Sequence, residues 1–553
     1  MAAILFLLKA REGALEPGVA STVSSLHDDD PCRDPLSVFI LPRSSWDEVV
    51  ATAHLLCTSF NPRPVKIVCV EAGIDVVCDR TKPPHGADPE AGDVEETAST
   101  GLPTPPVPPP SDFISYLSKN PDAQVRELIK PYLEYELELR RAFSQGGTGI
   151  DGLANLVQVF DGREDQFLPR ASGRNGSDKD KFLMRLPRDK QAKVIMDDFT
   201  QYERNFSAFT HSCLAGLDWS NIVAAGSSAL SPLLAYAGDY PDSLEEPAVE
   251  DPLETYYQYT ACSSDIDLFI YGLDEEAAMK KIVEIEATVR ENQRLPPGSG
   301  ITLRTQNALT FIGPRWPYRH VQIVLRLYKS ISEVLTGFDV DCACVAFDGR
   351  KVYTNPRGVA AIQTQTNLID LTRRSPSYEN RLYKYRMRGF DAYWGRLDRS
   401  RIDESSDTYQ EGWSSKGLSR LLFFERLLYT HQGSYAHFNR LRHRFKNTDD
   451  VAESGNAKGH AESDESGYTA IKLPYGQRYT ATTVRKYVSE RSREQHVFGT
   501  IVDVIEGKAD LNKKTAEHLQ CRLKFIKDDP GRQMIGSFYP LTEDGWTNDA
   551  YVK

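Results

Sequence analysis

The sequence predicts an α+β protein built around a mixed β-sheet that is flanked by helices. Apolar runs with strand-like alternation recur along the middle of the chain, as in residues 263–270 and 320–325. A helical pattern, clearest in residues 274–293, lies between them. The chain is 40% hydrophobic and 10% aromatic, which indicates a folded protein. A helical region should follow the sheet, with small α/β segments at the two ends.

A chain of 553 residues is long enough for two or more domains, and two acidic stretches, one of them rich in proline, suggest where they are joined. The expected division is a small N-terminal α/β domain at 1–88, a Pro-rich acidic linker at 89–111, a catalytic domain at 112–358, a helical domain at 359–444, an acidic linker at 445–467 and a C-terminal segment at 468–553.

The first part of the chain contains several predicted elements. Residues 2–8, 37–41 and 65–70 are expected to be strands, and residues 46–59 a helix capped by Ser44 or Ser45. Further along, we expect helices at 112–146, a loop at 161–181 and one long amphipathic helix at 189–217, in that order.

A glycine followed by two hydroxyl residues stands at a predicted strand-to-helix turn. Residues 221–225 form a short apolar strand, and Gly226, Ser227 and Ser228 lead into a short helix. A glycine lets a phosphate approach the backbone at such a turn, so these three residues are candidates for nucleotide binding. The acidic stretch 238–260 is expected to be an inserted loop.

Two aspartates stand at alternate positions of the following predicted strand. Asp265 and Asp267 share one face, because residues two apart on a strand point the same way. Two carboxylates on a rigid face are suited to holding a divalent cation against triphosphate oxygens. An exposed strand end after an ordinary glycine turn is the alternative interpretation.

A third carboxylate is expected downstream. After a strand at 320–325, residues 329–337 should form a helix capped by Ser330 or Ser332, and residues 338–345 a strand with both Asp339 and Asp341 on one face. Either aspartate is a candidate, and Asp339 is preferred. The competing position is Gln322 on the preceding strand, which would leave the site without a third acid.

Strand, Gly-Ser turn, helix and a strand with Asp-x-Asp together resemble the nucleotidyltransferase superfamily, the fold of DNA polymerase beta and the oligoadenylate synthetases. Residues 320–349 are also similar to segments of uncharacterised fungal and viral nucleotidyltransferase-like proteins. The resemblance implies that Gly226 and Ser227 contact a triphosphate. It also implies metal binding and catalysis, and the candidates are Asp265, Asp267, and Asp339 or Asp341. About 38 residues separate the Gly-Ser turn from the Asp-x-Asp strand, more than is usual in that superfamily.

A basic stripe is predicted on a later helix. Arg381, Lys384, Tyr385 and Arg388 follow each other at helical spacing. Guanidinium and ammonium groups would bind phosphate oxygens, and Tyr385 would stack on a base. A solvated basic face is the alternative.

Composition excludes several other classes. The net charge of −12 argues against a general nucleic-acid coating protein, and no apolar run approaches the length of a membrane span. Nine cysteines without a Cys-x-x-Cys pair argue against zinc, and their odd number fits a cytoplasmic or nuclear location.

The expected function is metal-dependent nucleotidyl transfer. A nucleoside monophosphate would pass from a nucleoside triphosphate to an unidentified hydroxyl acceptor with release of pyrophosphate, using Mg²⁺ or Mn²⁺. The acceptor could be RNA, a nucleotide or a protein. A template-free polymerase or a cyclic-nucleotide synthase is a further interpretation of the same enzyme. The alternative is a catalytically inactive scaffold on the same fold, with a protein partner bound through the acidic or Pro-rich linkers.

Overall fold

The chain forms two compact units, residues 1–99 and 100–553, and each is described here by itself. The computed structural model describes residues 37–41, 65–69, 74–78, 102–185, 193–235, 252–261, 264–296, 298–305, 307–403, 416–430, 462–463, 469–470, 481, 496–508, 523–526, 538, 540–548 and 550–552.

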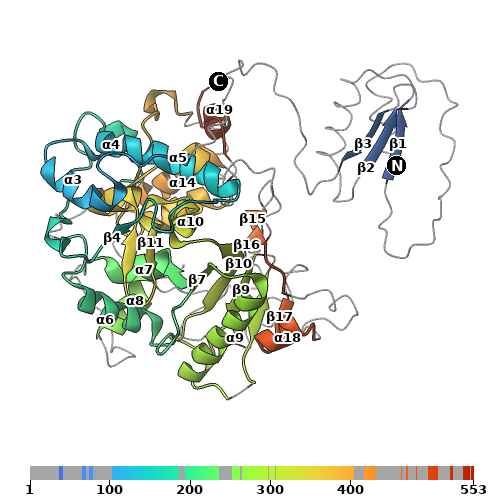
Figure 1. Cartoon of the computed structure of the whole chain (residues 1–553). Coiled ribbons are helices and arrows are strands. Elements are labelled where there is room, and N and C mark those ends of the chain that lie inside the picture. The colour runs from blue at the N-terminus through green and yellow to red at the C-terminus, as the bar shows by residue number, and fades with distance from the viewer. Residues whose placement is uncertain are drawn as a thin grey trace. The chain divides into compact units, whose positions relative to one another are not determined.

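The described part of the first unit is a three-stranded sheet (Figure 1). Strand β1 (Ser37–Leu41) pairs in parallel with β2 (Val65–Cys69), and β2 pairs antiparallel with β3 (Ile74–Cys78). The predicted strands at 37–41 and 65–70 are thereby confirmed, whereas β3 was not anticipated. The strand predicted at 2–8 and the helix predicted at 46–59 lie outside the described residues.

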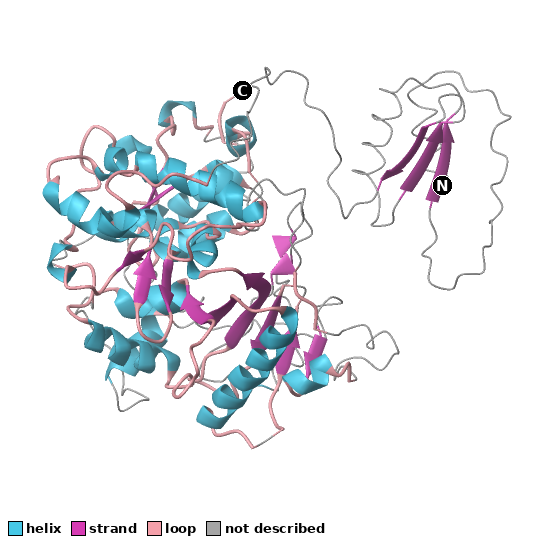
Figure 2. Ribbon diagram, viewed as in Figure 1, coloured by secondary structure: helices cyan, strands magenta, loops and turns pink. Residues whose placement is uncertain are grey.

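The second unit contains a mixed sheet, as the sequence predicts, and Figure 2 shows its strands with helices packed around them. The described strands follow the order β17-β8-β9-β10-β7-β6-β11-β12-β4. Their bounds are β4 (Val157–Gln158), β6 (Ile222–Ala225), β7 (Ile266–Tyr271), β8 (Thr302–Arg304), β9 (Ala308–Phe311), β10 (Val321–Tyr328), β11 (Val345–Phe347), β12 (Val352–Thr354) and β17 (His496–Phe498).

Strand β7 lies in the middle of the sheet. It is antiparallel to β6 and parallel to β10, with Asp267 in register with Gln322. Ile266 and Leu268 belong to the main core, whereas Phe269 belongs to a second cluster. Because side chains alternate along a strand, Asp267 lies on the same face as Phe269.

Helices cover both faces of the sheet. Apolar residues of α6 (Phe199–Thr210), α7 (Ser227–Leu233) and α9 (Glu275–Asn292) join the core on the face of Ile266. Helix α10 (Ile331–Thr336) packs against Phe269 on the other face. Of the two candidate caps of α10, the structure selects Ser330, whose hydroxyl accepts the backbone N–H of Glu333.

The remaining elements surround this sheet. Residues 112–146 are largely helical, as predicted, and the region after the sheet, expected to be mostly helical, also contains two short strands, β13 and β14, that were not anticipated. The other principal elements are α3 (Phe113–Lys119), α4 (Val125–Leu128), α5 (Lys130–Ser144), β5 (Phe182–Leu183), α8 (Pro252–Thr260), α11 (Pro356–Thr364), β13 (Thr366–Leu368), α12 (Tyr378–Arg386), β14 (Asp391–Tyr393), α14 (Gly417–Thr430), β15 (Glu462–Ser463), β16 (Thr469–Ala470), α18 (Ile501–Ile505) and α19 (Glu543–Thr547).

Two predicted segments have different bounds. The helix expected at 189–217 is shorter, because the carboxylate of Asp198 caps α6 and His211 ends it in a left-handed conformation. Residues 252–260 of the expected loop form α8, whose first residue is Pro252, a favourable position for proline, and residues 238–251 lie outside the described residues. None of the described helices is long and apolar enough to cross a membrane.

Candidate functional site

The Gly226 turn lies where the sequence predicts it, between β6 and α7. Gly226 has φ 75° and ψ −137°, a backbone conformation that disfavours any residue with a β-carbon. Its N–H donates to the carbonyl of Val345 at 2.9 Å, and a β-carbon there would stand 3.5 Å from the ring of Phe338. The turn is therefore fixed by β11 on one side and approached by the Phe338 segment on the other.

The two serines of the turn are buried and have different partners. The Ser227 hydroxyl donates to the Ser264 hydroxyl at 3.4 Å, and Ser264 immediately precedes Asp265. The Ser228 hydroxyl donates to the carbonyl of Ala225 at 3.0 Å. Ser227 therefore links the turn to the Asp-x-Asp segment, whereas Ser228 closes its own turn and does not offer its hydroxyl proton to a ligand.

Asp265 and Asp267 are both partly buried at the start of β7. Burial raises the pKa of Asp265, and repulsion from Asp267 raises it further. The pKa of Asp267 is raised by burial as well, and the positive charges of Lys384 and Arg381 oppose that rise. The pair therefore combines crowded negative charge with cations from a helix more than a hundred residues later.

Those cations come from the predicted basic stripe. Arg381 and Lys384 lie on α12, and Arg388 follows its end. Burial and the charge of Arg388 lower the pKa of Lys384, while Asp267 and Asp265 oppose that decrease. Arg388 donates a hydrogen bond to Ser264. The stripe thus faces the acidic segment, and the alternative of a purely solvated outer face is not what the structure shows.

Tyr385 differs from its neighbours on the stripe. Its ring is only 4% exposed and belongs to the main hydrophobic core. A ring at this depth has no open face for a base, which corrects the expectation that it stacks on a nucleotide. Helical spacing alone does not distinguish these roles, because position i+4 of a basic stripe can also lie at the edge of the apolar face.

The strand predicted at 338–345 is wrong. Only Val345 of that range is in a strand, β11, and Asp341 begins a 3-10 helix that runs to Ala343. Phe338 nevertheless stays near the site, because its ring packs against Phe269 with centroids 5.5 Å apart. The next residue, Asp339, is 3% exposed. Its carboxylate accepts hydrogen bonds from Ser375 and, at 2.9 Å, from Arg381.

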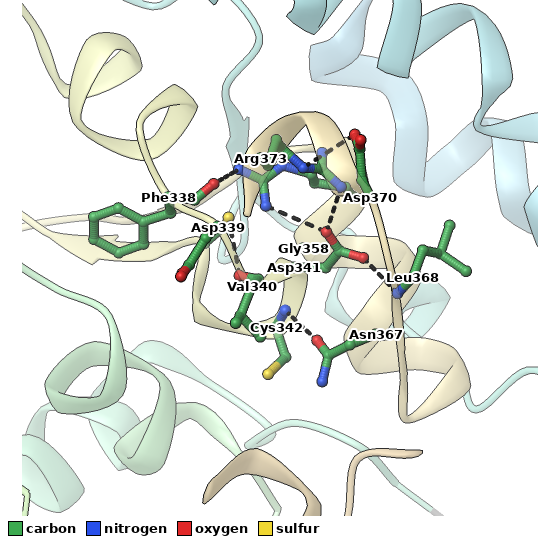
Figure 3. A network of polar contacts seen from close by, with 12 residues as sticks. Phe338, Asp339, Val340, Asp341, Cys342, Gly358, Asn367, Leu368, Asp370 and Arg373 are labelled. Carbon is green, nitrogen blue, oxygen red and sulfur yellow. Dashed lines mark hydrogen bonds and ion pairs between the residues drawn. The ribbon is translucent and has the colours of Figure 1, made fainter. Parts of the chain in front are cut away.

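Asp341 belongs to a buried ionic network (Figure 3). One carboxylate oxygen accepts from Arg357 at 3.3 Å and from Arg373 at 3.1 Å, and the other accepts the N–H of Leu368 at 2.7 Å. Arg357 also binds Glu136 of α5 at 2.7 Å. A carboxylate that is 1% exposed and held by these groups serves the fold, which corrects its place among the catalytic candidates.

Within the described residues, no three His, Cys, Asp or Glu side chains come together as a metal site would require. Asp265 and Asp267 by themselves fit a divalent cation, since both are oxygen donors and a cation would relieve their crowded charge. The residue in register beside Asp267 is Gln322, whose amide donates to the Thr310 hydroxyl at 3.2 Å. A third acidic ligand is thus not provided by β10.

Sequence reasoning missed Arg319, which supports the segment before Asp265. Its side chain is 1% exposed and donates to four backbone carbonyls, those of Phe209, Tyr257, Ala261 and Ser264. A guanidinium fork has enough donors for several carbonyls at once. The only signal in the sequence is a charged residue directly before an apolar strand, which does not reveal such a role.

Comparison with known proteins gives two partial similarities. Residues 192–365 match the sequence profile of the Gabija anti-defense 2 family. An uncharacterised protein of Acanthamoeba polyphaga mimivirus is 32% identical over 176 residues, which cover 30% of this chain and 38% of that protein. No solved structure matches. The family match includes the Gly226 turn and the Asp-x-Asp segments at Asp265 and Asp339, and it ends before α12.

Proposed function

We propose that this chain is a metal-dependent nucleotidyltransferase that transfers a nucleoside monophosphate to a hydroxyl acceptor and releases pyrophosphate. The observation that carries the proposal is the contact of three separate segments at Ser264. Ser227 of the glycine turn and Arg388 of the basic stripe both donate to its hydroxyl, and Asp265 is the next residue. A turn suited to phosphates, a carboxylate pair and a row of cations thus meet around one residue.

The side chains present divide the work of binding a triphosphate. The positive charge of Lys384 attracts both Asp265 and Asp267, and the positive charge of Arg381 attracts Asp267. Cations in this position would bind the phosphate oxygens that approach Asp265 and Asp267. Because Gly226 has no β-carbon, the turn would let the phosphate chain come close to its backbone beside the Phe338 ring.

Asp265 and Asp267 would hold Mg²⁺ or Mn²⁺, which would neutralise phosphate charge and favour deprotonation of the acceptor hydroxyl. Asp339 is the remaining candidate for a third ligand, because its neighbour Phe338 contacts both β7 and the Gly226 position. The sheet order supports the resemblance to nucleotidyltransferases, since the strand before the turn lies directly beside the Asp-x-Asp strand.

Incubation with each labelled nucleoside triphosphate and Mg²⁺ or Mn²⁺ tests the proposal. We expect pyrophosphate release and a labelled product whose identity reveals the acceptor class. Asp267→Asn should give neither pyrophosphate nor labelled product. The control is Lys280→Met, which replaces an exposed lysine on α9 and should match the wild type. Absence of product with every nucleotide, metal and acceptor class would remove the catalytic proposal.

The second candidate is an inactive scaffold on the same fold. It is favoured by Gln322 beside Asp267 and by the engagement of Asp339 with Arg381 and Ser375. If the chain is a scaffold, the wild type and Asp267→Asn should bind a partner equally well.

The family description, Gabija anti-defense, suggests the setting in which either activity would operate. We propose that the chain counteracts Gabija defence through its transferase site. Expression in cells protected by Gabija should reduce that protection for the wild type and not for Asp267→Asn. Equal reduction by both proteins would favour the scaffold.

A further inference from the structure

Asp339 is closed off by two neighbours. Ser375 donates to one of its oxygens, and Arg381 donates to the other at 2.9 Å. The carboxylate is 3% exposed, whereas the Arg381 side chain is 47% exposed. The arginine is therefore the partner with access to solvent, and its long side chain can leave without opening the core.

Arg381 stands at one end of the basic stripe. The positive charge of Arg381 also attracts Asp267. Lys384 lies one turn later, and its positive charge attracts both Asp265 and Asp267. The cations of α12 thus balance the carboxylates of the site. A triphosphate would compete for the same cations, and a divalent cation would compete for the same carboxylates.

We propose that Arg381 exchanges partners, from Asp339 in the ligand-free protein to a phosphate oxygen when triphosphate binds, and so releases Asp339 toward the divalent cation. This inference rests on the proposed function and adds its regulation.

The exchange couples the two ligands. Metal alone must displace Arg381 before Asp339 can contribute, and triphosphate alone must attract Arg381 away from a carboxylate. Each ligand removes the obstacle for the other, so binding of one should strengthen binding of the other by the same factor.

Arg381→Met separates this exchange from a structural role, because the two ligands should respond in opposite directions. Removal of the guanidinium frees Asp339, so Mn²⁺ alone should bind at least about threefold more tightly, the effect of a half-exposed charged contact. Inorganic triphosphate in the presence of a chelator should bind at least about threefold more weakly, because a phosphate partner is lost.

Asp339→Asn is the reciprocal variant. Arg381 then loses its ion pair with Asp339, so metal-free triphosphate should bind more tightly than it does to the wild type. Mn²⁺ should bind more weakly, because an oxygen donor with charge is lost. The matched control is Arg396→Met, an arginine whose side chain is 74% exposed and paired with Glu543, which should change neither affinity.

Isothermal titration of the full-length wild type and of each variant with Mn²⁺ and with inorganic triphosphate gives the affinities, and thermal unfolding confirms that each variant is folded. Opposite shifts in the two variants support the exchange. A wild type that binds both ligands, with Arg381→Met weakening both or changing neither, overturns the exchange and leaves the proposed function standing. A wild type that binds neither ligand overturns both.

Discussion

The Asp-x-Asp segments at Asp265 and at Asp339 have the same spacing and different environments. Asp265 and Asp267 flank Ile266 at the start of β7, and both are partly accessible. Asp339 and Asp341 flank Val340, and both are almost fully buried in contacts with arginine. The first pair retains crowded negative charge, whereas the second pair is neutralised by the fold.

The difference arises from backbone conformation and from the partners nearby. Residues at positions i and i+2 point to the same face only when the backbone is a strand. The chain is a strand at Asp267, but it forms a 3-10 helix from Asp341 onward. Asp339 therefore meets Arg381, while Asp341 meets Arg357 and Arg373. The same motif thus provides a candidate ligand pair at Asp265 and Asp267, whereas in the second segment Asp341 serves the core and Asp339 is held by Arg381.

Asp267→Asn is the sharpest test of the first segment. Transfer activity should be abolished, because the negative charge of Asp267, which would hold the metal and which balances the positive charge of Lys384, is lost. The free energy of unfolding without metal should stay the same or rise slightly, since a partly buried carboxylate beside Asp265 is itself unfavourable. Pyrophosphate release and urea unfolding measure the two effects. Parallel loss of stability would show that Asp267 is structural.

Asp341→Asn should have the reverse profile. Removing one charge of a buried network leaves Arg357 and Arg373 with fewer carboxylates to balance them, Glu136 and Asp370, which costs about 3 kcal/mol or more in stability. The loss should appear as a lower urea midpoint with an unchanged slope. A midpoint equal to that of the wild type would mean that Glu136 and Asp370 are enough to balance the two arginines.

Much of the fold could be predicted because it depends on local patterns. The strands at 221–225 and 320–325 and the helix at 274–293 follow from periodicity, and the Gly226 turn follows from the need for a residue without a β-carbon. The mixed sheet flanked by helices follows from the order of these elements.

What could not be predicted depends on distant partners. Asp341 is fixed by Arg357 and Arg373, which lie 16 and 32 residues further along the chain, and nothing in the local sequence reveals those pairs. The depth of Tyr385 likewise depends on the core against which α12 packs. The contact of Arg388 with Ser264, the basis of the functional proposal, joins residues 124 positions apart.

Gly226→Ala tests whether the first segment depends on its turn. The positive φ makes any β-carbon unfavourable by about 1–2 kcal/mol, although the nearest atom, in the Phe338 ring, would be at an ordinary contact distance. We expect a loss of that size in urea unfolding and weaker binding of triphosphate. Gly395→Ala, where φ is not positive and the nearest atom is 3.6 Å away, should stay within about 0.5 kcal/mol of the wild type.

Thiol reactivity gives the smallest and most local readout of the second segment. Burial raises the pKa of Cys344 to about 12 and that of Cys342 well above its usual value, so both should react slowly with iodoacetamide at pH 8. Asp341→Asn should accelerate both several-fold by loosening the adjacent network, and Asp267→Asn should not. Cys213, a buried thiol outside this network, is the internal control. Peptide mass spectrometry measures the modification of all three thiols. Equal acceleration at Cys213 would mean that the variant opens globally, and the local role of Asp341 would then be refuted.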